Sequence, residues 1–173
     1  MIQGSTVCLM LGVSDTVTGT DDEAFIICSQ VLEATGSAVL HGAFEPFASH
    51  FNEPTIFETF EGRRVIETKD ELRRTFEAAG AFYAGLGVTD LVRHVVAAAF
   101  SAPNTVHATI ECRVLAGTVL VLHPYSLHTV LEKVEDRWLI SETIYIIEDA
   151  PRFTRLVSFG PRTTTSLKVE PPA

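Results

Sequence analysis

Basic residues are missing from the first third of the chain. No Lys or Arg precedes Arg63, whereas the first 62 residues hold nine acidic side chains, and the whole chain has a formal net charge of −9. An acidic surface repels phosphate groups, and no basic stripe with interleaved aromatic residues offsets this repulsion. We therefore expect neither nucleic acid nor an anionic membrane as a partner.

Cysteine is scarce too. Cys8, Cys28 and Cys112 are widely separated, and no Cys-x-x-Cys, His-x-His or Glu-x-x-His spacing occurs. These absences argue against a disulfide framework and a zinc site, so we expect no metal and no other cofactor, in a cytoplasmic protein. The apolar run at residues 7–11 lacks a preceding basic residue, which indicates an arm rather than a secretory signal. We also expect no membrane span, which needs about 20 apolar residues.

The 173 residues, 46% of them hydrophobic, suffice for one domain with its own core. Residues 1–20 are rich in Thr, Ser, Gly and Val and predict an N-terminal arm. Residues 21–149 form the predicted body. Residues 150–173 contain Pro, Thr and Arg without periodicity and predict a surface tail.

Helical spacing dominates the first part of the body. Asp21 or Asp22 is the predicted cap of a helix that His41-Gly42 ends. A short helix over residues 43–51 follows. Extended segments at 54–60 and 63–68 flank Glu61-Gly62, which predicts a hairpin.

The second part of the body begins with one more helix. Thr68 to Glu71 is a capping-box start, and apolar residues recur at helical spacing up to Gly85. Four β-rich segments then follow, separated by short turns: 91–100, 106–115, 119–134 and 138–147. This order predicts an α+β fold, with N-terminal helices packed into the concave face of a strongly curved, mostly antiparallel sheet. A cone of this kind would enclose a cavity for a small molecule.

Five short motifs follow one another along the body: His41-Gly42, Glu58 to Gly62, Thr68 to Leu72, Arg93 to Val96 and Glu135 to Trp138. In the order and spacing of these motifs, the chain resembles the SnoaL-like group of the nuclear transport factor 2-like superfamily over about residues 22–148. The resemblance implies a cone-shaped α+β barrel, and proteins similar to this one commonly form homodimers through a sheet face. The superfamily includes isomerases, dehydratases, polyketide cyclases, oxygenase small subunits and noncatalytic adaptors, so the fold does not fix the function.

The resemblance argues against steroid-type isomerisation. Ketosteroid-isomerase-like members use a carboxylate base on the hairpin, and here Thr59 stands nearest to that position. Strand alternation directs Glu58 to the opposite face, unless the register slips by one residue. A threonine hydroxyl cannot replace the carboxylate as a base.

The match to scytalone-dehydratase-like members is closer but incomplete. His94 stands in the first long strand after the third helix, where such members carry a histidine, but a second histidine is missing near Ile110 and Glu111. An imidazole in an apolar cavity can move a proton near neutral pH, so His94 is our first candidate for acid or base. The competing interpretation is a core histidine satisfied by one partner.

Three further residues are secondary catalytic candidates. Glu111 is either a carboxylate that reaches into the cone or half of a surface pair. His128 lies on the opposite strand face from Tyr125, unless a bulge at Pro124 reverses this. Tyr145 alternates with Thr143 on the face expected to look into the cone.

The substrate-binding wall is predicted to be mainly apolar. Its predicted members are Thr59, Phe57, Val92, Val96, Leu122 and Thr143. Such a wall suits a small hydrophobic or aromatic compound. Two functions remain open: a cofactor-free proton-transfer enzyme (isomerase, dehydratase or cyclase), and a noncatalytic ligand-binding or dimeric assembly protein. The small subunit of a larger oxygenase is a weaker third hypothesis.

Overall fold

The computed structural model describes residues 19–148 and 150–160, so almost all of the predicted N-terminal arm lies outside the described residues. The elements in chain order are α1 (Asp21–Leu40), α2 (Phe44–Ala48), β1 (Phe51–Thr59), β2 (Gly62–Ile66), α3 (Lys69–Gly85), β3 (Asp90–Ala102), β4 (Thr105–Ala116), β5 (Val119–Leu120), β6 (Tyr125–Val134), β7 (Arg137–Ile146) and α4 (Pro151–Phe159).

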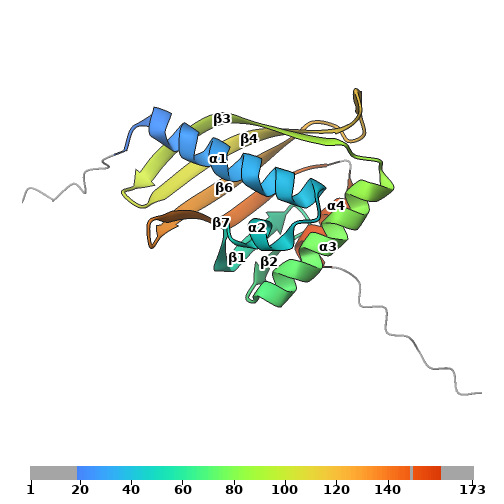
Figure 1. Ribbon diagram of the computed structural model, residues 1–173, viewed down its shortest axis with the longest axis horizontal. Coiled ribbons are helices and arrows are strands. Elements are labelled where there is room, and N and C mark those ends of the chain that lie inside the picture. The colour runs from blue at the N-terminus through green and yellow to red at the C-terminus, as the bar shows by residue number, and fades with distance from the viewer. Residues whose placement is uncertain (1–18, 149, 161–173) are drawn as a thin grey trace, which may run out of the picture.

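One sheet forms the back of the molecule, in the order β2-β1-β7-β6-β4-β3, with β5 paired to β4. Its pairs are antiparallel except β1 and β7, which run parallel. The long helix α1 lies across one face of the sheet, and α2, α3 and α4 gather at the end nearest to the β1–β2 hairpin (Figure 1). The predicted α+β fold class is confirmed.

The start of α1 differs from the prediction. Thr20 is the N-cap, and its side chain accepts a hydrogen bond from the backbone N–H of Glu23 at 3.2 Å. Asp21 and Asp22 lie in the first turn instead, where their negative charge favours the positive end of the helix dipole. The predicted cap at Asp21 or Asp22 was therefore wrong by one or two residues, because an extended threonine also supplies the capping oxygen.

By length and composition alone, α1 is the one helix among the described residues that could cross a membrane. That finding corrects our expectation that no segment approaches the required length. Packing offers another explanation for its apolar residues, because Ala24, Cys28, Val31 and Leu32 are buried in the core.

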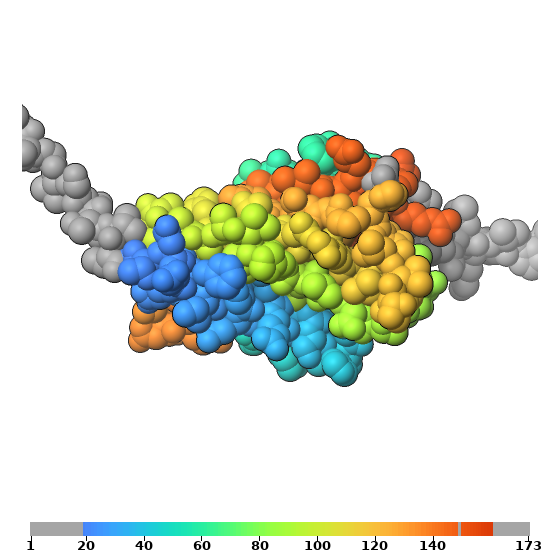
Figure 2. Space-filling model, turned by 90° about the horizontal axis from the view of Figure 1, so that it is seen from above, coloured from blue at the N-terminus to red at the C-terminus, as the bar shows by residue number. Residues whose placement is uncertain are grey.

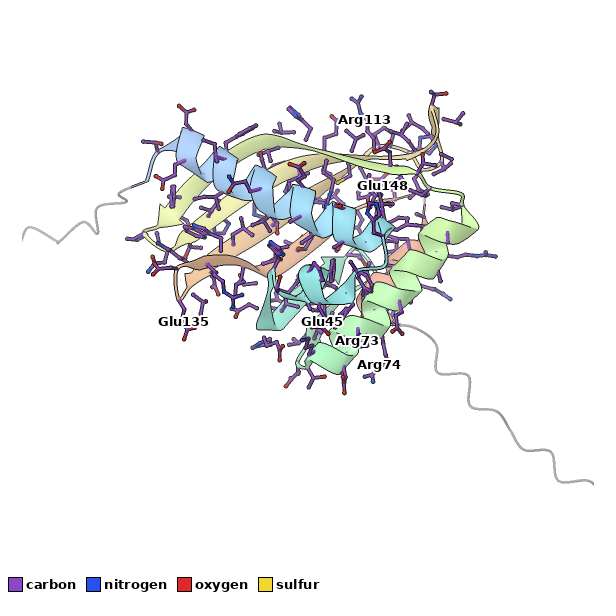
Figure 3. All side chains as sticks on the ribbon, viewed as in Figure 1. Glu45, Arg73, Arg74, Arg113, Glu135 and Glu148 are labelled. Atoms are coloured by element: carbon purple, nitrogen blue, oxygen red, sulfur yellow. The ribbon has the colours of Figure 1, made fainter. Side chains whose placement is uncertain are left out.

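The hairpin and α3 follow the prediction. The Thr68 side chain accepts a hydrogen bond from the Glu71 backbone N–H at 3.3 Å, and the Glu71 carboxylate accepts one from the Glu67 backbone N–H at 2.8 Å. That second hydrogen bond is the main cause that lowers the pKa of Glu71. On the neighbouring α2, Glu45 lies against Arg73 of α3 at 2.9 Å (Figure 3).

The predicted strand over residues 119–134 is divided. Only Val119–Leu120 and Tyr125–Val134 are strands, and Val121 keeps a single ladder-like hydrogen bond from its backbone N–H to the Val114 carbonyl at 2.9 Å. Pro124 precedes the second strand and has no N–H to donate to a ladder, which explains the break.

The C-terminal segment is not a surface tail where it is described. Residues 151–159 form α4, with Pro151 in its first turn, where the missing N–H costs nothing. Phe153 and Val157 are buried in the core, and the Ser158 hydroxyl hydrogen-bonds that of Thr59 on β1. Residues 161–173 of the predicted tail lie outside the described residues.

Truncation of Phe153 tests whether α4 belongs to the core. Phe153 is 3% exposed and Phe159, on the same helix, is 66% exposed. We expect Phe153→Ala to lower the free energy of unfolding by about 3–5 kcal/mol. Phe159→Ala, the matched control, should change it by about 0.5 kcal/mol or less. Urea unfolding followed by circular dichroism measures both, and equal effects would contradict the packing of α4.

Candidate functional site

A cavity of about 100 Å³ lies between the helices and the concave face of the sheet. Each of α1, α2, α3 and α4 contributes to its wall, together with β1, β3, β4, β6 and β7. Apolar side chains predominate, among them Leu32, Phe57, Leu72, Phe76, Leu127 and Phe153. The cavity predicted from the cone-shaped architecture is therefore present.

All three tyrosines of the chain line this cavity, although they come from α3, β6 and β7. The ring of Phe153 contacts each of them, with centroid distances of 5.8 Å to Tyr83, 6.5 Å to Tyr125 and 5.6 Å to Tyr145. Because Phe153 belongs to α4, this helix holds the tyrosine cluster against the inside of the cone.

The phenols are hydrogen-bond donors at neutral pH rather than bases. Burial raises the pKa of Tyr83 to about 12, an effect that a hydrogen bond with Tyr125 partly offsets. Burial also raises the pKa of Tyr125 well above its usual value, and it raises that of Tyr145 as well. Protonated phenols can donate to a ligand oxygen, but they cannot take a proton from it.

Arg93 brings a positive charge to the same wall. Its half-buried guanidinium donates a hydrogen bond to the Leu32 carbonyl of α1. It also lies directly against Gly36, where any larger side chain would collide with it. Because Gly36 has no side chain, α1 leaves space for the guanidinium of Arg93.

Two buried thiols lie within the field of Arg93 and are protonated at neutral pH. Burial raises the pKa of Cys112 to about 12 and that of Cys28 to about 11, and the charge of Arg93 opposes both shifts. A thiol is nucleophilic as the thiolate, so neither cysteine is poised as a nucleophile.

The predicted position of His94 was wrong. Its side chain is exposed on the outer face of the sheet, and its immediate neighbour Arg93 faces the cavity instead. Successive residues of a strand point to opposite faces, so only one of the two can face inward. Glu111 is the register partner of His94 and lies on the same outer face, paired with Arg113 at 2.6 Å. Of the two interpretations of Glu111, the surface pair is the correct one.

His128 also lies outside the cavity. Its Nε2 is 3.4 Å from Nδ1 of His107 on β4, and neither residue lines the cavity. Tyr125 faces inward on the same strand, so the predicted opposition of these two residues is confirmed and Pro124 does not reverse it. Tyr145 is the one predicted catalytic residue that lines the cavity.

Two of the six residues predicted for the substrate wall line the cavity. Phe57 and Thr143 line the cavity, and the Thr143 hydroxyl is 3.3 Å from that of Thr129. Val92 and Val96 are exposed, because they share the strand face of His94. Leu122 lines shallow surface hollows instead of the central cavity.

Thr59 faces inward, as predicted, but lies outside the cavity. It is buried against α4, where its hydroxyl hydrogen-bonds Ser158 and accepts from the Glu61 backbone N–H at 3.1 Å. Glu58 faces the other way and pairs with Arg63 at 3.5 Å, so the register does not slip. No carboxylate base reaches the cavity from this hairpin.

Among the described residues, no Asp, Glu or His lines the cavity. Within the same ranges, no group of three or more His, Cys, Asp or Glu side chains is arranged to hold a metal ion. Arg113 also contributes to the wall, but its side chain is 56% exposed and paired with Glu111 on the outer face. The cavity can therefore offer apolar contacts, phenol donors and the guanidinium of Arg93.

Sequence reasoning missed Arg93, Tyr83 and Tyr125 as site residues. A signal existed for Tyr83, because Leu72, Phe76, Ala79 and Tyr83 share one helix face, and all four line the cavity. No comparable signal distinguished Arg93 from His94. Strand alternation shows that the two side chains lie on opposite faces of β3, but it does not show which face is covered by α1.

No protein-family model matches the chain, and no curated protein matches it either. Solved structures do match its fold. A domain of unknown function with a cystatin-like fold from Nostoc punctiforme is 24% identical, over 76% of this chain and 80% of that chain, with a TM-score of 0.59. An NTF-2 like protein of unknown function from Shewanella oneidensis is 15% identical, over 70% and 97%, with a TM-score of 0.56.

A third solved structure, an NTF2-like protein with a cystatin-like fold from Novosphingobium aromaticivorans, is 11% identical over 78% of this chain and 88% of that chain, with a TM-score of 0.57. Similarity at this level shows a shared fold and not a shared activity. The chain has the nuclear transport factor 2-like fold, as the resemblance implied. Its assignment to the SnoaL-like group stays a prediction.

The tyrosine cluster predicts an unusual alkaline titration. An ordinary phenol has a pKa of about 10, whereas all three phenols of the folded chain have raised pKa values. The unfolded chain therefore loses these protons first as the pH rises. The neutral phenols contribute stability below about pH 10, and this contribution is lost as the pH rises towards the pKa values of the folded state.

Near-ultraviolet absorbance titration of the folded and the urea-unfolded chain measures this difference. We expect no tyrosine ionisation near pH 10 in the folded protein and full ionisation of the unfolded chain around that pH. A phenol that titrates normally in the folded protein would contradict the burial of the cluster.

Proposed function

We propose that the protein binds a small, largely apolar molecule in its cone cavity and that it acts as a ligand-binding protein rather than as a proton-transfer enzyme. One observation carries the proposal: the described wall combines apolar side chains with phenol and guanidinium donors and contains no carboxylate or imidazole. A few placed polar groups in an apolar pocket are typical of small-molecule sites.

The enzyme hypothesis lacks a base. Proton abstraction requires a group near the substrate that is deprotonated at the working pH. The tyrosines and Cys112 have raised pKa values, and His94 and Glu111 lie on the far side of the sheet. Of the predicted catalytic residues, only Tyr145 lines the cavity, and its protonated phenol would act as a hydrogen-bond donor that orients a ligand.

The volume of the cavity limits the ligand. A cavity of about 150 Å³ holds benzene, so about 100 Å³ suits a branched aliphatic group or a small ring with slight expansion. Phe153, Leu156 and Val157 of α4 form part of the wall. A larger ligand would require α4 to shift.

We further propose that the protein is a homodimer through the outer face of the sheet near β3. This strand ends the sheet and runs along the surface beside α1 (Figure 2). Val92 and Val96 are 45% and 60% exposed there, and the exposed Ala97 and Ala99 leave room for close approach of a second copy. Exposed apolar side chains gathered on one face favour an interface.

Filling the cavity tests ligand binding. Ala79 lines the cavity from α3, whereas Ala84 on the same helix is exposed. In a thermal-shift screen of small apolar compounds, we expect ligands at 100 times their dissociation constant to stabilise the wild type by about 2.7 kcal/mol. Ala79→Phe should abolish these shifts, and the control Ala84→Phe should retain them. Shifts that survive Ala79→Phe would place the ligand elsewhere.

A charge at the proposed dimer face tests the assembly. We expect the wild type to sediment at twice the mass of the chain and Val96→Lys to sediment as a monomer, because the lysine would lose its hydration in the interface. Val65 on β2 is 44% exposed and far from β3 in the sheet order, so Val65→Lys is the control and should remain dimeric. Sedimentation velocity distinguishes these outcomes, and a monomeric wild type would refute the dimer.

A further inference from the structure

Arg93 has more donor capacity than its surroundings use. A guanidinium carries five N–H donors and no acceptor. The Leu32 carbonyl is its single hydrogen-bond acceptor within the described part of the chain, and no carboxylate there forms an ion pair with it. Most of its N–H groups are therefore available to another acceptor.

The positive charge of Arg93 acts inside the cavity. It opposes the raised pKa of Tyr83, of Tyr145 and of Cys112, so its field reaches three separate parts of the wall. A partly buried cation without a counter-ion is costly, and this cost favours any anion that can enter. The described wall supplies no such anion.

The position of the guanidinium is fixed by α1. Gly36 leaves the space that the guanidinium fills, and Leu32, one turn earlier, holds it by a hydrogen bond. A surface arginine would point into solvent, whereas these contacts hold the guanidinium of Arg93 at the cavity. A fixed planar fork is suited to bind a carboxylate through two parallel hydrogen bonds.

We propose that the ligand of the cavity is a small monocarboxylic acid whose carboxylate binds Arg93 while its apolar body contacts Phe57 and Leu127. This inference rests on the proposed binding function and deepens it. The protonated phenol of Tyr83 or Tyr145 completes the carboxylate site as a donor. A phosphate ester is a poorer fit, because it carries up to two negative charges. Of the two arginines in the described wall, Arg113 is already paired with Glu111, which leaves Arg93 for the ligand in a volume of about 100 Å³.

A matched pair of ligands tests the proposal in the wild-type protein. Isovalerate and isovaleramide have nearly the same size and shape but differ in charge. Hydrogen bonds to charged groups are worth more than neutral ones, so we expect isovalerate to bind at least about tenfold more tightly than isovaleramide. Isothermal titration calorimetry at neutral pH measures both affinities. Benzoate and benzamide form a second pair that tests a ring.

Substitutions at Arg93 assign the preference to this residue. Arg93→Met should remove the preference for the acid while the amide still binds, and Arg93→Lys should retain part of it. Gly36→Ala should weaken the preference without any change in charge, because the added methyl group displaces the guanidinium. His94→Met, at the adjacent but outward position, is the control and should behave as the wild type.

The outcomes separate the two proposals. If acid and amide bind equally to the wild type, or if Arg93→Met keeps the preference, the carboxylate assignment is wrong and the binding function stands. If the acids, the amides and purely apolar probes such as benzene all fail to bind, the binding function is wrong as well. Should Arg93→Met fail to fold, as judged by circular dichroism, the wild-type comparison and Gly36→Ala decide.

Discussion

The contact between Arg93 and α1 determines how the inside of the cone is organised. The guanidinium fills the space beside Gly36 and hydrogen-bonds the Leu32 carbonyl, so the long helix and the edge strand β3 are joined through a charged group. Strand alternation then sends His94 outward. Because Arg93 faces the cavity and His94 faces outward, the cavity contains a guanidinium and lacks an imidazole.

The other side of the cavity depends on α4. Phe153 contacts all three tyrosines, and the hydrogen bond between Ser158 and Thr59 attaches the helix to β1. The phenols are consequently removed from water and stay protonated. The site thus has a cation at α1 and β3 and neutral donors beneath α4, with apolar side chains between them. This polarity suits an acceptor group on the ligand and offers no place for a ligand cation.

Much of the fold could be predicted from the sequence, because its signals are local. The Thr68 cap, the Glu61-Gly62 turn and the apolar spacing of α3 each follow from a few neighbouring residues. The faces of β3 could not be predicted, since His94 with Val92 and Val96 looked as suitable for the interior as Arg93 with Leu91 and Val95. Placement of a long charged side chain depends on a distant partner, here Gly36. α4 was missed for a related reason: nine residues are too few to show a clear helical period, and they become helical when the core receives Phe153 and Val157.

The two faces of the sheet have separate chemical roles, and this separation bears on function. The inner face of β3, β4, β6 and β7 carries Arg93, Cys112, Tyr125 and Tyr145, whereas the outer face carries His94, Glu111 and His128. These imidazole and carboxylate groups thus lie across the sheet from the cavity. Proton transfer to or from a bound ligand would require such a group on the cavity side of the sheet. The composition of the inner face therefore agrees with the proposed binding function, and the exposed valines of the outer face agree with the proposed dimer.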